Sequence, residues 1–141
     1  MVAGVTADFD PLKTVERFWH GWESLDAGAI LSTIAAQDDV VIIGTDASEY
    51  WVGHQALIEP FAAMVSAFDA EHVQWAIGDP VVHVNGSVAR VVGRLTATVR
   101  AGEEHTTSEM RATFILERAA REWLIVHAHF SVPSPAPVVT Y

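Results

Sequence analysis

The stretch VVHVNGSVARVV, residues 81–92, decides how the second half of the chain folds. Asn85-Gly86 stands between two segments rich in β-branched residues, and this dipeptide favours two-residue β-hairpin turns because both of its residues tolerate positive φ angles. The pattern therefore predicts a strand over residues 81–84, a turn at Asn85-Gly86 and a long strand over residues 88–99.

The two-residue period of a half-buried strand continues on both sides of this hairpin. Toward the C-terminus, turn residues at 101–102 and 119–121 separate two further strands, and toward the N-terminus a Gly-Asp-Pro turn at 78–80 follows another. We expect a strongly curved, mixed or antiparallel sheet of about six strands, over residues 40–43, 71–77, 81–84, 88–99, 104–117 and 123–131.

The N-terminal half instead repeats apolar residues every three or four positions, which is typical of helices. Asp10-Pro11 predicts the N-cap and first residue of one helix, and Asp26 caps a short second helix. A third helix is expected over residues 57–68, with a kink or a late start because Pro60 lies inside it. Helices followed by a meander indicate an α+β domain whose three helices pack on the concave face of the sheet.

No repeat or long polar linker divides the chain, so we expect one domain over residues 1–141. Its core covers residues 8–133, and the proline-rich residues 134–141 form an extended tail. No segment approaches the roughly 20 apolar residues that span a bilayer, and residues 1–13 lack the basic and apolar regions of a secretory signal. We therefore expect a cytoplasmic protein with no membrane partner.

The charge balance excludes several classes of partner. The chain has 141 residues, with 8 Lys and Arg against 18 Asp and Glu, and its formal net charge is −10. Nucleic acids and anionic membranes require clustered basic residues, so neither is an expected partner. Only 18% of the residues are charged while 50% are hydrophobic, which indicates that apolar surface meets a ligand or a partner. Cysteine is absent, which excludes disulfides and cysteine-based metal sites.

The order helix, helix, strand, helix and meander resembles the cone-shaped, cystatin-like fold of nuclear transport factor 2 and ketosteroid isomerase. Two segments, GTDASEYWVG at residues 44–53 and WLIVHAHFS at residues 123–131, are similar to the SnoaL-like group of this superfamily in particular. That group is related to the association domain of calcium/calmodulin-dependent kinase II. The resemblance implies a cone with a hydrophobic pocket, and a homodimer that uses the convex face of the sheet.

Hairpin geometry brings polar residues of three strands onto one face. If residues 101–102 form a two-residue turn, Arg94 lies opposite Glu109. If the next hairpin closes in the matching register, Arg111 lies opposite His129 on the same face. A one-residue slip in either hairpin would separate this cluster, whose members are Arg94, Glu109, Arg111, His127 and His129.

We interpret this cluster as a polar floor inside the cone. Arg94 and Arg111 would bind a carboxylate or enolate-like oxygen, and His127 or His129 would move a proton. The resemblance supports this, because both arginines look like pocket arginines of the kinase association domain. The alternative is that Glu109 neutralises both arginines at a dimer interface or rim. We expect the two histidines to hydrogen-bond to their neighbours and to hold no metal.

Residues 44–53 are expected near the mouth of the cone. Asp46 is a candidate base, because a carboxylate in an apolar cavity can have a raised pKa; alternatively, it accepts backbone hydrogen bonds in a turn. Tyr50 and Trp51 are candidate ligand contacts. One of the two indoles of the first helix, Trp19 or Trp22, would give a ring-shaped ligand a flat aromatic wall, and Trp19 is the candidate ligand contact.

Together these features predict a protein that binds a small hydrophobic or acidic molecule without a metal or cofactor. Any chemistry would be acid–base isomerisation, cyclisation or dehydration of a hydrophobic carbonyl compound or acid. Two alternatives remain open. The domain is a non-catalytic binding or oligomerisation module similar to the kinase association domain, or its pocket is vestigial and filled by side chains.

Overall fold

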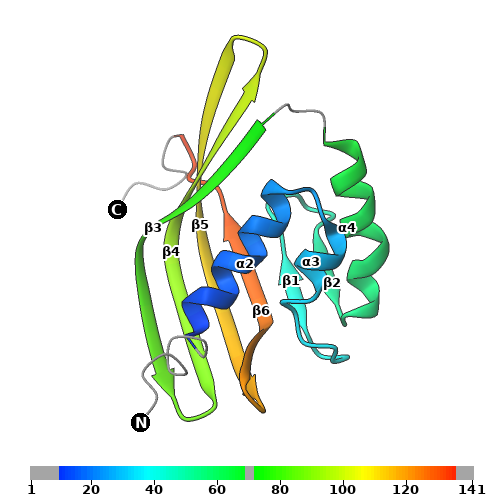
Figure 1. Ribbon diagram of the computed structural model, residues 1–141, viewed down its shortest axis with the longest axis vertical. Coiled ribbons are helices and arrows are strands. Elements are labelled where there is room, and N and C mark those ends of the chain that lie inside the picture. The colour runs from blue at the N-terminus through cyan, green and yellow to red at the C-terminus, as the bar shows by residue number, and fades with distance from the viewer. Residues whose placement is uncertain (1–9, 69–71, 136–141) are drawn as a thin grey trace.

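A computed structural model describes residues 10–68 and 72–135 of the chain (Figure 1). Within them the elements follow in the order α2 (Pro11–Glu23), α3 (Ala27–Leu31), β1 (Val41–Ile43), β2 (Tyr50–Val52), α4 (Gln55–Ala67), β3 (His72–Asn85), β4 (Val88–Ala101), β5 (Glu104–Ala119) and β6 (Glu122–Ser131). The expected α+β class is confirmed. The ends of the expected core and tail, residues 8–9 and 136–141, and residue 71 of an expected strand lie outside the described residues.

The described strands form one six-stranded sheet in the order β2-β1-β6-β5-β4-β3. Every neighbouring pair is antiparallel except β1 and β6, which are parallel. The predicted number of strands is confirmed, but two members differ. Tyr50–Val52 pairs with β1 although it was expected in a loop. The two expected strands before the hairpin are one strand, β3, with an irregular register between Gly78 and Val81.

Helices α2 and α3 begin where the sequence predicts their caps. The Asp10 carboxylate accepts a hydrogen bond from the Leu12 N–H at 2.9 Å, and the Asp26 carboxylate accepts one from the Ala29 N–H at 3.0 Å. Of the two alternatives for the third helix, the structure excludes the late start, since α4 begins at Gln55 and continues through Pro60. Among the described residues, no helix is both long enough and apolar enough to cross a membrane.

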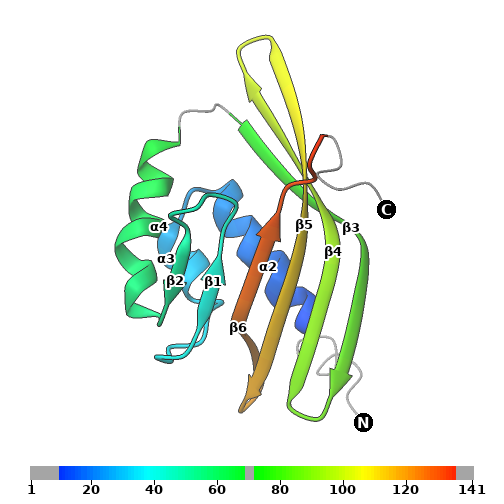
Figure 2. The same ribbon diagram turned by 180° about the vertical axis from the view of Figure 1, so that it is seen from behind.

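All three described helices lie on the concave face of the sheet, and none of them covers the convex face (Figures 1 and 2). α2 crosses the sheet and contacts β3, β4 and β6. Its fully buried Phe18 meets Phe114 of β5 with ring centroids 5.6 Å apart. The Thr14 hydroxyl donates to the Trp123 carbonyl at 2.7 Å, which fixes α2 against the end of β6.

Side chains alternate between the two faces of the sheet. On β5, Ala112, Phe114 and Leu116 are buried beneath the helices, whereas Arg111 is exposed on the convex face and Thr113 beside it is half-buried. The neighbouring strands follow the same pattern, with Val91 and Leu95 of β4 buried on the concave side. On β6 a register shift between Ile125 and His127 changes the parity, so that Ile125 and Ala128 are both buried on this side. Between such irregularities, the parity of a residue on its strand decides whether it faces the helices.

Candidate functional site

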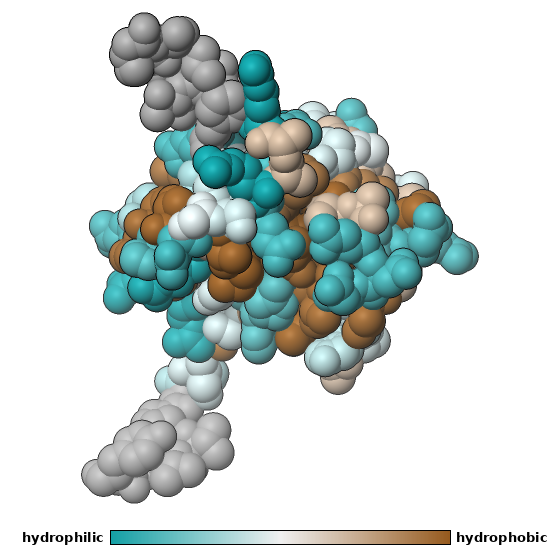
Figure 3. Space-filling model, turned by 90° about the horizontal axis from the view of Figure 1, so that it is seen from below, coloured by the Kyte–Doolittle hydropathy of each residue, from teal (hydrophilic) through white to brown (hydrophobic). Residues whose placement is uncertain are grey.

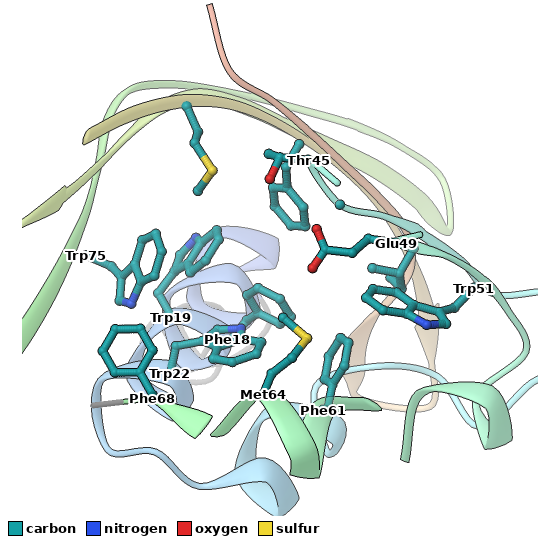
Figure 4. A pocket seen from close by; sticks show the side chains of 14 residues that line it. Phe18, Trp19, Trp22, Thr45, Glu49, Trp51, Phe61, Met64, Phe68 and Trp75 are labelled. Carbon is teal, nitrogen blue, oxygen red and sulfur yellow. The ribbon is translucent and has the colours of Figure 1, made fainter. Parts of the chain in front are cut away.

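A cavity of about 260 Å³ lies between the helices and the concave face of the sheet (Figure 4). Its walls come from α2, the β1–β2 loop and its flanking strands, α4, and strands β3, β5 and β6. The lining residues are Phe18, Trp19, Trp22, Ile42, Gly44, Thr45, Glu49, Trp51, Phe61, Met64, Phe68, Trp75, Met110 and Phe130.

Aromatic rings make up more than half of the 14 lining side chains. Phe61 of α4 lies between two indoles, with ring centroids 5.5 Å from Trp22 and 5.6 Å from Trp51. Trp19 and Trp75 stack with centroids 4.8 Å apart. Neither of these two indole N–H groups has a hydrogen-bond acceptor among the described residues, although both are buried. The cavity thus offers ring surfaces rather than a network of paired polar groups.

Glu49 is the only charged side chain among the described residues that line the cavity. Its Oε1 accepts a hydrogen bond from the Asp46 N–H at 2.9 Å, and its own N–H donates to the Asp46 carbonyl at 2.9 Å. Figure 4 shows the carboxylate extending from the Trp51 side toward the aromatic rings across the cavity. No basic side chain in the described part of the chain forms an ion pair with it.

The hairpin between β1 and β2 positions this carboxylate. The Gly44 N–H donates to the Glu49 carbonyl at 2.7 Å, which closes the loop. Because Gly44 has no side chain, the carboxylate folds over its backbone into space that a Cβ would occupy.

Of the four residues predicted at the mouth and the aromatic wall of the cavity, Trp19 and Trp51 line it, and Tyr50 and Asp46 do not. Tyr50 is 62% exposed, because alternation along β2 turns Trp51 inward and Tyr50 outward. Asp46 is exposed and contributes its backbone rather than its carboxylate to the site. Glu49 belongs to the segment expected near the mouth of the cone, but no role in the site was predicted for it. Had residues 50–52 been recognised as a strand, the two-residue period would have placed Glu49 on the same face as Trp51.

The predicted register of the hairpin between β4 and β5 is wrong. Arg94 lies opposite Arg111, and Glu109 lies opposite Thr96. The turn residues are 102–103 rather than 101–102, and Gly102 has a φ of 64°. The glycine therefore occupies the first central position of the turn, where a positive φ is required in type II′ turns.

The register of the hairpin between β5 and β6 also differs from the prediction. His129 lies opposite Thr113, and Arg111 lies opposite Ser131. The register of this hairpin shifts between Ile115 and Leu116. On the side of the shift that is farther from the turn, side chains therefore lie on the same relative faces as in the predicted register. All members of the predicted cluster consequently share one face, as expected, but this is the convex face: Arg94, Glu109, Arg111, His127 and His129.

None of these five residues is among the described residues that line the cavity, so the expectation of a polar floor is wrong. The concave positions of β4 to β6 belong instead to the apolar core. On the convex face, Arg111 Nε donates to Ser131 Oγ at 3.1 Å and the His127 Nδ1–H donates to the Val41 carbonyl at 2.9 Å. No arginine pairs with a carboxylate within the described ranges, and no three His, Asp or Glu side chains there gather as a metal site.

Comparison with known proteins identifies relatives of the whole domain. A family model described as a SnoaL-like domain matches residues 12–135. No curated protein matches the chain.

Solved structures share the fold at low sequence identity. An NTF2-like protein of unknown function from Pseudomonas putida is 20% identical, with a TM-score of 0.73 over 86% of this chain and 83% of that one. A protein from Thiobacillus denitrificans, provisionally described as a calcium/calmodulin-dependent protein kinase type II association domain, is 19% identical, with a TM-score of 0.73 over 89% and 97%. A protein from Streptomyces avermitilis, provisionally described as a dehydratase of the NTF2-like family, is 16% identical, with a TM-score of 0.73 over 86% and 92%. These similarities establish the fold, which is shared by proteins of different descriptions.

Proposed function

The chain belongs to the SnoaL-like domain family, and we propose that it binds a small hydrophobic molecule in the cavity on the concave face of its sheet. The observation that carries this proposal is an apolar, largely aromatic cavity of about 260 Å³. That volume is many times the roughly 30 Å³ that one water occupies in the liquid. A cavity of this size supports a working pocket over a vestigial one. A ligand that filled it would bury apolar surface, which contributes about 25 cal/mol per Å² to the free energy of binding.

Neighbouring aromatic residues on β2 allow a direct test of this site. Trp51 lines the cavity, whereas Tyr50 points outward. We expect wild-type protein to bind a neutral single- or double-ring compound such as 2-naphthol in a calorimetric titration. Trp51→Ala should weaken this binding by about 10-fold or more, because a wall of the pocket is lost, and Tyr50→Ala should leave it unchanged. Failure of the wild-type protein to bind any ring compound, neutral or charged, would contradict the proposal.

The position of Glu49 supports a second candidate function, cofactor-free proton transfer. Only one of its carboxylate oxygens has a hydrogen bond within the described residues, and the group extends into the cavity. A carboxylate in reach of a bound substrate suits general acid–base chemistry, of the isomerase, cyclase or dehydratase type on a hydrophobic carbonyl compound. The relative described as a dehydratase favours testing this class.

Exchange of α-protons for deuterium measures such proton transfer without knowledge of the natural substrate. If Glu49 is a base, wild-type protein should accelerate exchange in a bicyclic ketone such as 2-tetralone, followed by NMR in D₂O. Glu49→Gln should abolish the acceleration. Glu59→Gln, a change at an exposed position on α4, should retain it. Equal rates with and without protein would leave ligand binding without catalysis as the function.

We also propose that a second copy of the chain covers the convex face. That face carries exposed Arg94, Arg111 and Glu109 without ion pairs in the described chain, and the same face carries apolar Val81 and Val88 at one end. Figure 3, which views the molecule from below, shows hydrophobic side chains at the surface between hydrophilic ones. Light scattering should give a dimer, whereas a ring of many subunits would favour an assembly module.

A paired substitution tests this surface. Thr113→Arg, at the centre of the convex face, should yield monomers, whereas Thr107→Arg near the β4–β5 turn should remain dimeric.

A cytoplasmic location stays a prediction, which cell fractionation would test.

A further inference from the structure

The cavity combines aromatic walls with one unpaired carboxylate, and these are the two groups that recognise organic cations. We infer that its ligand carries a positive charge, as a quaternary or protonated amine attached to a compact apolar body. This inference rests on the proposed function, that the cavity binds a small hydrophobic molecule.

The aromatic walls favour a cation because the face of an aromatic ring is electronegative. A cation within about 6 Å of a ring centroid is attracted to it, most strongly when the ring is an indole. Four of the lining residues are indoles, from α2, β2 and β3: Trp19, Trp22, Trp51 and Trp75. Trp22, Phe61 and Trp51 follow one another along one wall with centroids 5.5 and 5.6 Å apart, so a cation beside this wall would lie near several rings at once.

The charge of the lining favours the same class of ligand. Glu49 is half-buried and has no basic partner among the described residues, and no Lys, Arg or His there lines the cavity. A cation that leaves water needs a compensating charge, which this carboxylate supplies. An anionic ligand would meet the carboxylate and find no basic side chain, because Arg94 and Arg111 lie on the opposite face of the sheet. The net charge of −10 also attracts cations toward the protein.

The cavity volume limits the size of the ligand. At about 260 Å³, the cavity lies just below the range of roughly 300–1,000 Å³ that is typical of pockets for drug-sized ligands. One aromatic ring with a small ammonium group is a probe of suitable size.

Three probes of similar shape and different charge separate the contribution of charge from that of apolar contact. They are 3-hydroxyphenyltrimethylammonium, its neutral carbon analogue 3-tert-butylphenol, and the anion 3-hydroxybenzoate. In calorimetric titrations at low salt, we expect the cation to bind the wild-type protein about 10-fold more tightly than the neutral analogue. The anion should bind most weakly of the three.

Neutralising the carboxylate tests its share of this preference. Glu49→Gln should weaken binding of the cation by about 10-fold while changing binding of the neutral analogue by less than about twofold. Glu59→Gln is the matched control, since this residue is exposed on α4 and does not line the cavity; it should change neither. Circular dichroism would verify that both variants fold. If Glu49→Gln does not fold, the ratio of the wild-type affinities for the cation and the neutral analogue still tests the preference for a cationic ligand.

The outcomes distinguish the two proposals. Binding of the neutral analogue or the anion as tightly as the cation would overturn the inference of a cationic ligand and leave the binding function intact. Binding of none of the three probes would overturn the binding function itself. A preference for the cation that survives Glu49→Gln would overturn the role of Glu49.

Discussion

Gly44 and Glu49 approach each other so closely that a Cβ on Gly44 would lie 2.5 Å from Oε1 of Glu49 and 2.7 Å from its Cβ. Both residues belong to the hairpin between β1 and β2, and two backbone hydrogen bonds hold its loop closed. The position of the carboxylate in the cavity therefore depends on a glycine five residues earlier in the chain.

Gly44→Ala should displace the Glu49 side chain. We expect a loss of about 1–3 kcal/mol in the free energy of unfolding, which is typical of overpacking, and an approximately fivefold or greater loss of affinity for the ammonium probe. Gly28→Ala is the control, because a Cβ there meets its nearest neighbour, Asp26 Oδ1, at an ordinary 3.4 Å. Urea denaturation and calorimetry measure both effects. Unchanged affinity in Gly44→Ala would argue against a role for this glycine in positioning Glu49.

Phe114→Ala should strongly destabilise the fold. This side chain is 0% exposed, and its ring lies 5.6 Å from Phe18 and 5.6 Å from Phe130. Removing a buried phenyl ring costs about 3–5 kcal/mol, because a cavity remains. Tyr50→Ala, at an exposed aromatic position, should stay within about 0.5 kcal/mol of wild type. Similar denaturation midpoints for the two variants would show that Phe114 is not a centre of the core.

Asp10→Ala should weaken the start of α2, because the Leu12 N–H loses its acceptor. Loss of an N-cap costs about 1 kcal/mol. Asp10→Asn should retain most of this stability, since its side-chain oxygen still accepts the hydrogen bond. Thermal unfolding compares the three proteins, and an Asn variant as unstable as the Ala variant would assign the effect to charge rather than to capping.

Gly86→Ala should destabilise the hairpin between β3 and β4. Gly86 has a φ of 63°, a conformation that costs a residue with a Cβ about 1–2 kcal/mol. Ala120 already adopts a φ of 56° in the β5–β6 turn, so Ala120→Gly should not lower stability there. Opposite results at the two positions, measured by urea denaturation, would contradict this account of the turns.

The sequence predicts local features of this domain well, because short-range chemistry determines them. The caps at Asp10 and Asp26 are confirmed, and the hairpin around Asn85-Gly86 is present. Its turn comprises residues 86–87, one residue later than predicted. Gly102 and Ala120 likewise take the first central position of their turns with positive φ. A glycine identifies a turn, but its position within the turn, and hence the register, depends on the turn type.

The site was harder to predict, because it depends on which face of the sheet meets the helices. Strand alternation correctly grouped Arg94 with Arg111 but assigned the pair to the wrong side. The apolar series that includes Ala112, Phe114 and Leu116 on β5 was the available signal for the concave face. No role was predicted for Glu49, because the strand that places it, Tyr50–Val52, has only three residues and two of them are exposed.

The irregularity in β3 has a consequence for how copies of this protein behave in concentrated solution. β3 lies at one edge of the sheet that the described strands form, and an edge strand of 14 residues offers backbone groups to which a strand of another molecule can add. At the interruption between Gly78 and Val81, Asp79 has a φ of 50°, and Pro80 lacks a backbone N–H. A second strand that paired along this edge would find no N–H donor at Pro80, so its ladder of hydrogen bonds would be interrupted there. We therefore expect the bulge to oppose fibre-like aggregation.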